Sequence, residues 1–336
     1  MTETADRPLV TFALFAYNQE QYIREAVEGA FAQTYEPLEI ILSDDCSTDR
    51  TFEIMQEMAA AYEGPHEVRV RRSRYNVGII DHVLSVAREA QGELLLVAAG
   101  DDISYHDRAS KITDAWSSES AAAVYSGNDV CDDEGRVIQR NHIPEPLDRI
   151  QKLFEGCDKP KRFDGKVRNI PGYSAAYDIE VIRRLPVGAK GANNEDALLT
   201  YFINLLGGRI TFVKEPLMCR RMSKTSVSAR SKFSNLSEIM ENERVISKFS
   251  RSTLNFYEYF FNLDQLEGND DYEKVKQRLS NKKSFHELVA SFWPHNPVNR
   301  VALILSHHGR NELKFIFPRI FGMHIFCFLK YMALRR

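Results

Sequence analysis

Three pairs of adjacent acidic residues could do chemistry, and they lie far apart in the chain: Asp44-Asp45, Asp101-Asp102 and Glu195-Asp196. We call them the first, second and third acidic pair. Adjacent carboxylates at the end of a buried strand repel each other and lose solvation, and a hard divalent cation that also holds phosphate oxygens compensates for this. A carboxylate after a strand can accept hydrogen bonds from a nucleobase or a ribose. A carboxylate within hydrogen-bond reach of a hydroxyl can act as a general base.

Each acidic pair also has an interpretation without chemistry. Gly100 precedes the second pair, and Gly-Asp-Asp forms turns well. The first pair lies close to Ser47 and Asp49, and all of these residue types start helices. The third pair follows the Gly-rich turn Gly188–Asn194 and opens a predicted helix, where acidic residues complement the helix dipole. Taken alone, each pair therefore leaves both interpretations open.

The segments that must position the first two pairs alternate between strand and helix. The second pair ends the apolar run Leu94–Ala98, whose length suits a strand buried on both faces of a parallel sheet. Asn18 and Gln21 have the spacing of a capping box and predict the start of a first helix, and Ser47–Asp49 predict the start of a second. This alternation predicts an α/β fold with a parallel sheet covered on both faces. The other predicted strands of this part are Leu9–Tyr17, Leu38–Ser43 and Val68–Arg71.

The regular alternation of predicted strands and helices ends after the second acidic pair. A basic pair, Arg220-Arg221, could stabilise a diphosphate through charge-assisted hydrogen bonds, or it could form a solvated basic turn. A loop as long as Asn141–Lys166 is usually functional or mobile. The elements predicted here are helices at Lys111–Trp116, Ile179–Arg184 and Glu195–Leu206, strands at Ala122–Ser126 and Arg209–Val213, and a turn at Asp132–Gly135.

Several motifs in order resemble the family-2 inverting glycosyltransferases, of the kind that act in bacterial surface polysaccharide synthesis. The string Glu39–Asp49 is the most specific of them, and the resemblance covers about Pro8 to Ser228. The other matching motifs are Phe15-Ala16-Tyr17-Asn18, Ala32–Tyr35, Asn76-Val77-Gly78, Gly92-Glu93, Gly100-Asp101-Asp102, Glu195-Asp196, Pro216-Leu217 and Arg220-Arg221.

The resemblance implies a GT-A fold, which has a Rossmann-like, mostly parallel central sheet flanked by helices. It implies a glycosyltransferase domain over residues 1–230, with a nucleotide-binding half at about 1–104 and an acceptor half at about 105–230. Residues 231–336 are mixed in charge and are expected to form a helical C-terminal region.

The resemblance also implies an activity, in which a sugar moves with inversion from a nucleotide-sugar donor to a hydroxyl of a glycan or a lipid-linked acceptor. Asp196 would be the general base, Asp101 and Asp102 would bind Mg²⁺ or Mn²⁺, and Glu195, Arg220 and Arg221 would contact the diphosphate or the acceptor. The nucleotide would be bound by Ala16, Tyr17, Asn18, Asp44, Asp45, Asn76, Gly100 and Asp101.

The chain departs from the family pattern at two positions. Ala99 stands where the family's Asp-x-Asp has its first aspartate, which leaves fewer carboxylates for a metal. Met222 stands where many members have a histidine that helps hold the diphosphate or the metal. His82 and His106 lie near the motifs in sequence, but lone histidines are more often structural, and we assign them no role.

The end of the chain predicts contact with a membrane surface. Leu313–Arg336 is rich in aromatic and aliphatic residues and is interrupted by charges, which suits an interfacial segment better than a spanning one. The alternative is a core helix packed on the main domain. With no recognisable secretory signal and five scattered cysteines, we expect a cytoplasmic protein that docks on the inner face of the cell membrane. The formal net charge of −3 gives no drive toward nucleic acid.

Two other functions stay open. A nucleotidyltransferase can share a similar nucleotide-binding half, but it would need a Gly-rich loop with a basic residue after the first strand, and Phe15–Gln21 has neither. A catalytically silent nucleotide- or sugar-binding protein that assembles partners would explain Ala99 and Met222. Detection of sugar transfer or donor hydrolysis would distinguish it from an enzyme.

Overall fold

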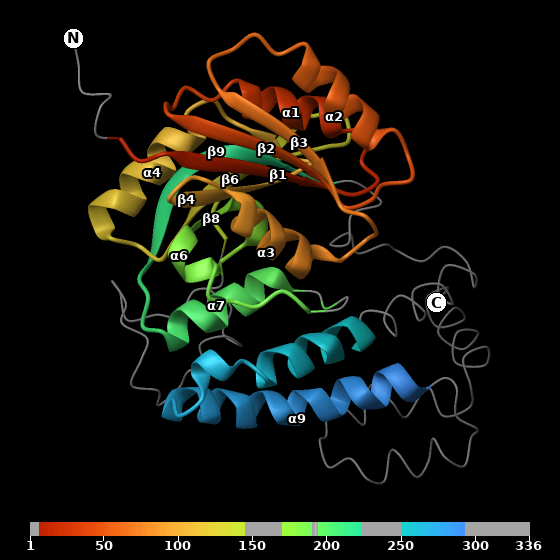
Figure 1. The fold of residues 1–336 in the computed structure, drawn as a ribbon, viewed down its shortest axis with the longest axis vertical. Helices are drawn as coiled ribbons and strands as arrows, with labels where there is room; N and C mark the ends of the chain where they lie inside the picture. Colours follow the sequence, from red (N-terminus) through yellow and green to blue (C-terminus); the bar gives the residue numbers. More distant parts are fainter. Residues whose placement is uncertain (1–6, 145–169, 190–191, 193, 223–249, 293–336) are drawn as a thin grey trace, which may run out of the picture. The chain divides into compact units, whose positions relative to one another are not determined.

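The computed structural model describes residues 7–144, 170–189, 192, 194–222 and 250–292 (Figure 1). The described residues divide into two compact units. The first lies within Met1–Ala229 and Leu263–Val275, and the second within Arg230–Asn262 and Lys276–Arg336. Most of the predicted loop Asn141–Lys166 and all of the predicted membrane-contacting tail Leu313–Arg336 fall outside the described residues.

The first unit is built on one mixed sheet, whose strand order is β3-β2-β1-β4-β8-β6-β9-β5, with β7 paired to β6. Strands β1 to β4 are parallel to one another, and β8 runs antiparallel between β4 and β6. The predicted parallel sheet with helices on both faces is confirmed for this first half. The strands are β1 (Val10–Ala16), β2 (Leu38–Asp44), β3 (Glu67–Arg72), β4 (Leu94–Ala99), β5 (Ile103–Ser104), β6 (Ala123–Cys131), β7 (Val137–His142), β8 (Ala175–Asp178) and β9 (Ile210–Arg221).

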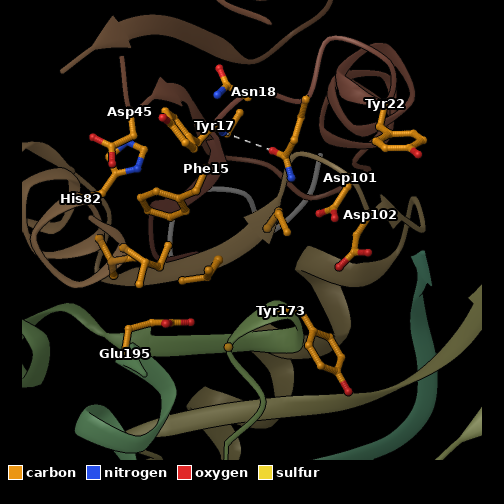
Figure 2. Close-up of a pocket in the computed structure, with 18 of the residues that line it drawn as sticks. Phe15, Tyr17, Asn18, Tyr22, Asp45, His82, Asp101, Asp102, Tyr173 and Glu195 are labelled. Carbon is orange, nitrogen blue, oxygen red and sulfur yellow. Dashed lines mark hydrogen bonds between the residues drawn. The ribbon is translucent and has the colours of Figure 1, made fainter. Parts of the chain in front are cut away.

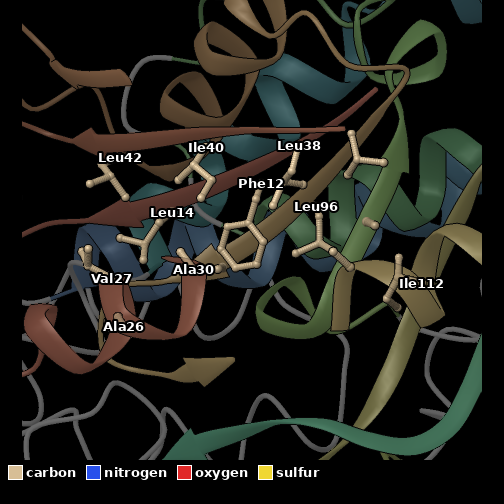
Figure 3. Packing of buried hydrophobic residues seen from close by; sticks show 14 of the residues in the cluster. Phe12, Leu14, Ala26, Val27, Ala30, Leu38, Ile40, Leu42, Leu96 and Ile112 are labelled. Atoms are coloured by element: carbon tan, nitrogen blue, oxygen red, sulfur yellow. The ribbon is translucent and has the colours of Figure 1, made fainter. Parts of the chain in front are cut away.

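Alternate residues of β1, β2 and β4 point to opposite faces of the sheet, as strand geometry requires. Phe12, Leu14 and Ile40 are fully buried on one face. Helices α1 (Ile23–Phe31) and α2 (Thr51–Ala60) cover that face in Figure 1, and Figure 3 shows Ala26, Val27 and Ala30 of α1 packed on these strands. Helix α4 (Arg108–Glu119) adds Ile112 to the same cluster.

The opposite face of the sheet carries α3 (Ile79–Glu89), which lies across β1 in Figure 1. Its buried positions include Val83 and Val86, in agreement with the predicted helix face, but also Asp81 and His82. Helices α6 (Ile179–Ile182) and α7 (Glu195–Leu205) pack against α3. This face is therefore partly polar, and its polar side chains lie where the strands end.

The predicted starts of the first two helices are wrong. Helix α1 begins at Ile23 with Tyr22 as a cap that makes no side-chain hydrogen bond, and α2 begins at Thr51. Asn18 does not cap α1; it has a φ of 52°, and its side-chain oxygen accepts the N–H of Thr48 at 2.8 Å. The polar residues that start helices well join the β1–α1 loop to the β2–α2 loop, and of these Asp49 also accepts the N–H of Thr51, the first residue of α2.

Strand β9 is longer than predicted. It runs through Pro216 to Arg221, because a register shift near Gly127 lets it keep pairing with β6 past the proline. Its far end also pairs with the two-residue strand β5, where Ile103 lies opposite Cys219. The basic pair Arg220-Arg221 is therefore strand and not a turn, and its alternative interpretation as a solvated turn is wrong for Arg221, which is 3% exposed.

The described part of the second unit is helical, as expected for this region. Residues 250–261 form a helix on which Phe256 and Phe260 stack with ring centroids 5.9 Å apart. After the short 3-10 helix η3 (Asp264–Leu266), helix α9 (Asp270–Phe292) begins in the first unit and continues into the second. Among the described residues, there is no helix with the length and apolar character needed to cross a membrane.

Candidate functional site

A cavity of about 700 Å³ opens at the carboxyl ends of β1 and β4 in the first unit. Figure 2 shows side chains from several separated segments pointing toward it. Members of all three acidic pairs line it, together with the end of β9 and the short 3-10 helix η2 (Gly172–Ser174). The predicted site residues on its wall are Ala16, Tyr17, Asn18, Asp45, Asn76, Asp101, Asp102, Glu195, Asp196, Arg220 and Arg221.

Asp45, from the first acidic pair, holds the loop that precedes α3. Its two carboxylate oxygens accept the backbone N–H groups of Val77 and Gly78, each at 3.0 Å. Gly78 has a φ of 84°, a backbone conformation that favours glycine. Each oxygen keeps a further acceptor position, so Asp45 can both fix this loop and accept from a ligand in the cavity.

The two predicted site residues that do not line the cavity are Asp44 and Gly100. Asp44 is fully buried, and one of its oxygens accepts the N–H of Ser47 at 2.9 Å and pairs with Arg72 at 3.2 Å. Asp44 therefore holds the turn after β2 and caps no helix, because α2 begins only at Thr51. Gly100 lies behind the wall, where an added Cβ atom would lie 2.9 Å from the Cβ atom of Ala16. Glycine is required there by close approach.

The second acidic pair is held against the end of β9. The Arg221 N–H donates to Asp102 Oδ1 at 2.8 Å, and the Arg221 guanidinium donates to the carbonyl of Asp101 at 3.0 Å. Burial raises the pKa of Asp101, and burial together with the neighbouring Asp101 charge raises the pKa of Asp102. The pair therefore carries a free-energy cost when both carboxylates are ionised, and a bound cation would relieve it.

The two arginines of β9 have different surroundings. Arg221 is occupied inside the protein, since its guanidinium also donates to the carbonyls of Asp132 and Asp133 and forms an ion pair with Glu25 at 3.0 Å. Arg220 lies over the ring of Tyr173, with its guanidinium carbon 4.7 Å from the ring centroid. Arg220 therefore borders the cavity as a cation beside an aromatic ring, whereas Arg221 positions the acidic turn.

Sequence reasoning missed a buried arginine behind the second acidic pair. Arg108 is 1% exposed and donates to Ser104 Oγ at 2.8 Å, to the carbonyl of Val97 at 2.6 Å and to that of Tyr173 at 3.3 Å. It thus joins β4 to the η2 segment that carries Tyr173. No local sequence signal distinguishes such an arginine from the exposed ones of an ordinary helix.

The third acidic pair opens α7 on the other side of the cavity from β1. Gly172 makes room for it, since a Cβ atom at that position would lie 2.4 Å from Glu195 Oε1. Burial, followed by the charge of Asp196, raises the pKa of Glu195. One Asp196 oxygen accepts the N–H of Ala197 at 2.7 Å. The pair therefore has one carboxyl group that favours protonation next to a second one that accepts a backbone N–H in the first turn of α7.

The loop before α7 is anchored by Asp81, an acidic residue of α3. Asp81 Oδ1 accepts the N–H groups of Gly188 and Ala189 at 2.8 and 2.9 Å. Asp81 was missed in the sequence, where it reads as an ordinary acidic residue in the first turn of a helix. It connects α3, which borders the Asp45 end of the cavity, to the segment that leads to the third pair.

His82 also lines the cavity, although sequence reasoning assigned it no role. Its Nε2 lies 2.6 Å from Ser43 Oγ, and its ring meets Phe15 edge to face with centroids 5.0 Å apart. Burial lowers its pKa to about 4, against the opposite effect of Asp45, so the ring is uncharged near neutral pH. His82 and Ser43 are 39 positions apart, so only the packing of α3 on β2 shows the contact.

The residues present suit a divalent cation that is shared with a ligand. Among the described residues, there is no group of three or more histidine, cysteine or acidic side chains that could hold a metal without help. The second pair supplies two carboxylates with raised pKa values. Two carboxylates suit Mg²⁺ or Mn²⁺ when phosphate oxygens and water complete the coordination of the cation.

Comparisons with known proteins agree with this architecture. A putative teichuronic acid biosynthesis glycosyltransferase of Bacillus subtilis, TuaG, is 28% identical over 155 residues, which cover 45% of this chain and 60% of that protein. An uncharacterised protein of Mycobacterium tuberculosis is 44% identical over 88 residues, which cover 26% of this chain and 25% of that protein. The chain thus spans a quarter to three fifths of the length of these relatives.

A solved mannosyltransferase of Pyrobaculum calidifontis, in complex with GDP-Man and Mn²⁺, has the same fold. The TM-score is 0.54 at 14% identity, and the match covers 98% of this chain and 88% of that one. The predicted GT-A fold is thereby confirmed.

The family model described as Glycosyl transferase family 2 matches residues 11–185, which is just over half of the chain. These residues include β1 to β4, the first two acidic pairs and His82. The chain belongs to glycosyl transferase family 2.

Proposed function

We propose that the protein is an inverting glycosyltransferase that moves a sugar from a nucleoside-diphosphate sugar to a hydroxyl of a glycan acceptor. The observation that carries this proposal is the meeting of all three acidic pairs on one cavity. The mannosyltransferase with the same fold binds GDP-Man, which supports a donor of this class. The teichuronic acid enzyme of Bacillus subtilis supports a role in polysaccharide synthesis. A lipid-linked acceptor and membrane docking through Leu313–Arg336 stay predictions.

In this proposal the donor lies along the cavity from the first acidic pair to the second. Asp45 accepts from the nucleoside, and Arg220 faces the diphosphate. Asp101 and Asp102 would hold Mg²⁺ or Mn²⁺, and the manganese ion of the mannosyltransferase supports a cation of this kind. When bound, such a cation neutralises the negative charge that grows on a departing diphosphate.

Asp196 is the proposed general base. It takes the proton from the acceptor hydroxyl while the hydroxyl oxygen attacks the anomeric carbon of the donor sugar. The new C–O bond forms on the face opposite the diphosphate, and the bond from the anomeric carbon to the diphosphate oxygen breaks with its electron pair on the leaving group. The configuration at that carbon is therefore inverted. The position of Asp196 on the wall of the cavity that the second pair also lines supports this role.

The test is sugar transfer by the full chain, measured against a panel of nucleotide sugars with glycan acceptors and Mn²⁺. Asp196→Asn keeps the shape of the side chain but cannot take a proton. We expect it to lower the turnover by about 10²–10⁴, the usual contribution of a positioned general base, and to leave donor affinity largely unchanged.

The matched control is Asp114→Asn, which alters an exposed aspartate of α4 outside the cavity and should transfer sugar at the wild-type rate. Normal transfer by Asp196→Asn would remove the base assignment. Donor binding by the wild-type chain with neither transfer nor hydrolysis would favour the catalytically silent binding protein.

A further inference from the structure

Next to Asp45, the cavity wall carries a second polar group, the ring of His82. The contacts of this ring determine whether it donates or accepts a hydrogen bond at the cavity. Figure 2 shows the His82 ring beside the Asp45 carboxylate, and both side chains line the cavity. The two groups lie apart from Asp101 and Asp102 in this view. If the second acidic pair takes the diphosphate, this part of the wall meets the nucleoside.

The neighbours of His82 determine which ring nitrogen carries the proton. The Arg71 guanidinium can only donate, and it donates to Ser43 Oγ at 2.9 Å. Among the described residues, the acceptor within reach of the Ser43 hydroxyl proton is His82 Nε2, at 2.6 Å. Because Nε2 accepts, the uncharged ring has its proton on Nδ1.

The Nδ1 atom is available to a ligand. No hydrogen bond from it to a described residue is present, and it is not among the polar atoms that are sealed in the described interior without a partner. Phe15 fixes the plane of the ring by meeting it edge to face at an interplanar angle of 89°. His82 therefore presents an N–H donor of fixed direction at the cavity wall, beside the acceptor Asp45.

We propose that His82 and Asp45 together read the hydrogen-bonding edge of the donor's nucleobase, and that the base carries an N–H next to a C=O, as uracil and guanine do. This inference rests on the proposed function. The His82 Nδ1–H donates to the ring carbonyl, and Asp45 accepts from the ring N–H. Ser43 and Arg71 are positioning residues, since they act on the base only through the proton of His82.

Bases whose edge has the opposite order of hydrogen-bond donor and acceptor fit this wall less well. Cytosine and adenine have a bare ring nitrogen next to an amino group, so the two protein groups would have to exchange targets on the base. The ring N–H of uracil or guanine is also more acidic than an amino N–H, and it is therefore the better donor to a carboxylate. A site built to hydrogen-bond one edge discriminates against a ligand that leaves its polar groups unpaired.

The experiment measures the affinity of the full chain for UDP, GDP, CDP and ADP by calorimetry in the presence of Mn²⁺. For the wild-type chain, we expect UDP or GDP to bind at least about tenfold more tightly than CDP and ADP, as the net effect of one or two hydrogen bonds implies. Tightest binding of CDP or ADP would overturn the inference without any variant, while leaving the proposed function in place.

His82→Phe keeps a flat ring and removes the donor. We expect it to weaken the preferred nucleotide by about tenfold and to change CDP and ADP much less, so that the preference collapses. His82→Gln, whose amide can donate, should restore part of the preference. The matched control is His106→Phe, at a histidine outside the cavity, which should bind all four nucleotides as the wild type does.

The outcomes separate this inference from the proposed function. Equal weakening of all four nucleotides by His82→Phe, or no change at all, would show that His82 is structural and would overturn the inference alone. Absence of nucleotide binding by the wild-type chain, together with absence of sugar transfer, would overturn both.

Discussion

Single side chains in this cavity are held in protonation states that their residue types do not suggest. Glu195 is the clearest case for a stability measurement, because burial and Asp196 raise its pKa to about 8. A carboxyl group with a raised pKa binds a proton more tightly in the folded chain than in the unfolded chain. Its contribution to stability is therefore complete below the unfolded value of 4.5 and is lost as the pH rises toward 8.

Glu195→Gln keeps a neutral group at this position at every pH. We expect the melting temperature of the variant, relative to wild type, to be clearly higher at pH 8.5 than at pH 5, because only the wild type must ionise a buried carboxyl group there. Differential scanning calorimetry of both chains at the two pH values measures this. Glu180→Gln, at an exposed position of α6, is the control and should show the same difference at both pH values. A pH-independent effect of Glu195→Gln would contradict the account.

At the scale of elements, the site depends on contacts that join one loop to another. Asp81 in α3 provides a sharp test, because its carboxylate accepts the backbone N–H groups of Gly188 and Ala189 in the loop before α7. Without this acceptor, the two N–H groups lose their partner, at a cost of about 1–3 kcal/mol. The loop should then open locally more often, and the start of α7 should be less well fixed.

We expect Asp81→Ala to speed amide hydrogen exchange at Gly188 and Ala189 by about tenfold to hundredfold, since exchange reports the free energy of local opening. Mass spectrometry of the peptide that holds both residues gives the rate. Asp107→Ala, which removes an ion pair with Lys111 on α4, should leave that peptide unchanged. Unaltered exchange in Asp81→Ala would mean that Asp81 does not anchor the loop.

The elements also show which features the sequence can predict. Strands β1, β2 and β4 were predicted nearly to the residue, because their apolar runs are buried on both faces and end in turn residues. The start of α1 was predicted wrongly, because Asn18 binds the β2–α2 loop, a contact between segments 30 positions apart that overrides local capping. The contacts of Arg221 and His82 could not be predicted for the same reason: each depends on partners that only the folded sheet brings near.

At the scale of the whole molecule, parallel and antiparallel strand pairing together bring residues to one cavity. The parallel strands β1, β2 and β4 bring the first and second acidic pairs to the same edge of the sheet, as the alternation of strands and helices predicted. Strand β8 then runs antiparallel beside β4, and β9 returns along β6, so that Tyr173 and Arg220 reach that edge from the second half of the unit. The sequence predicted the acidic pairs but not this return path.

The central claim is that one nucleoside diphosphate lies in this cavity between Asp45 and Asp101. The most direct test is a crystal structure of the full chain grown with Mn²⁺ and whichever of UDP or GDP binds more tightly. The account predicts a base whose edge meets Asp45 and His82, with the diphosphate and a Mn²⁺ ion at Asp101 and Asp102. A nucleotide bound elsewhere on the chain, or one bound in the cavity with its phosphates away from Asp101, would contradict it.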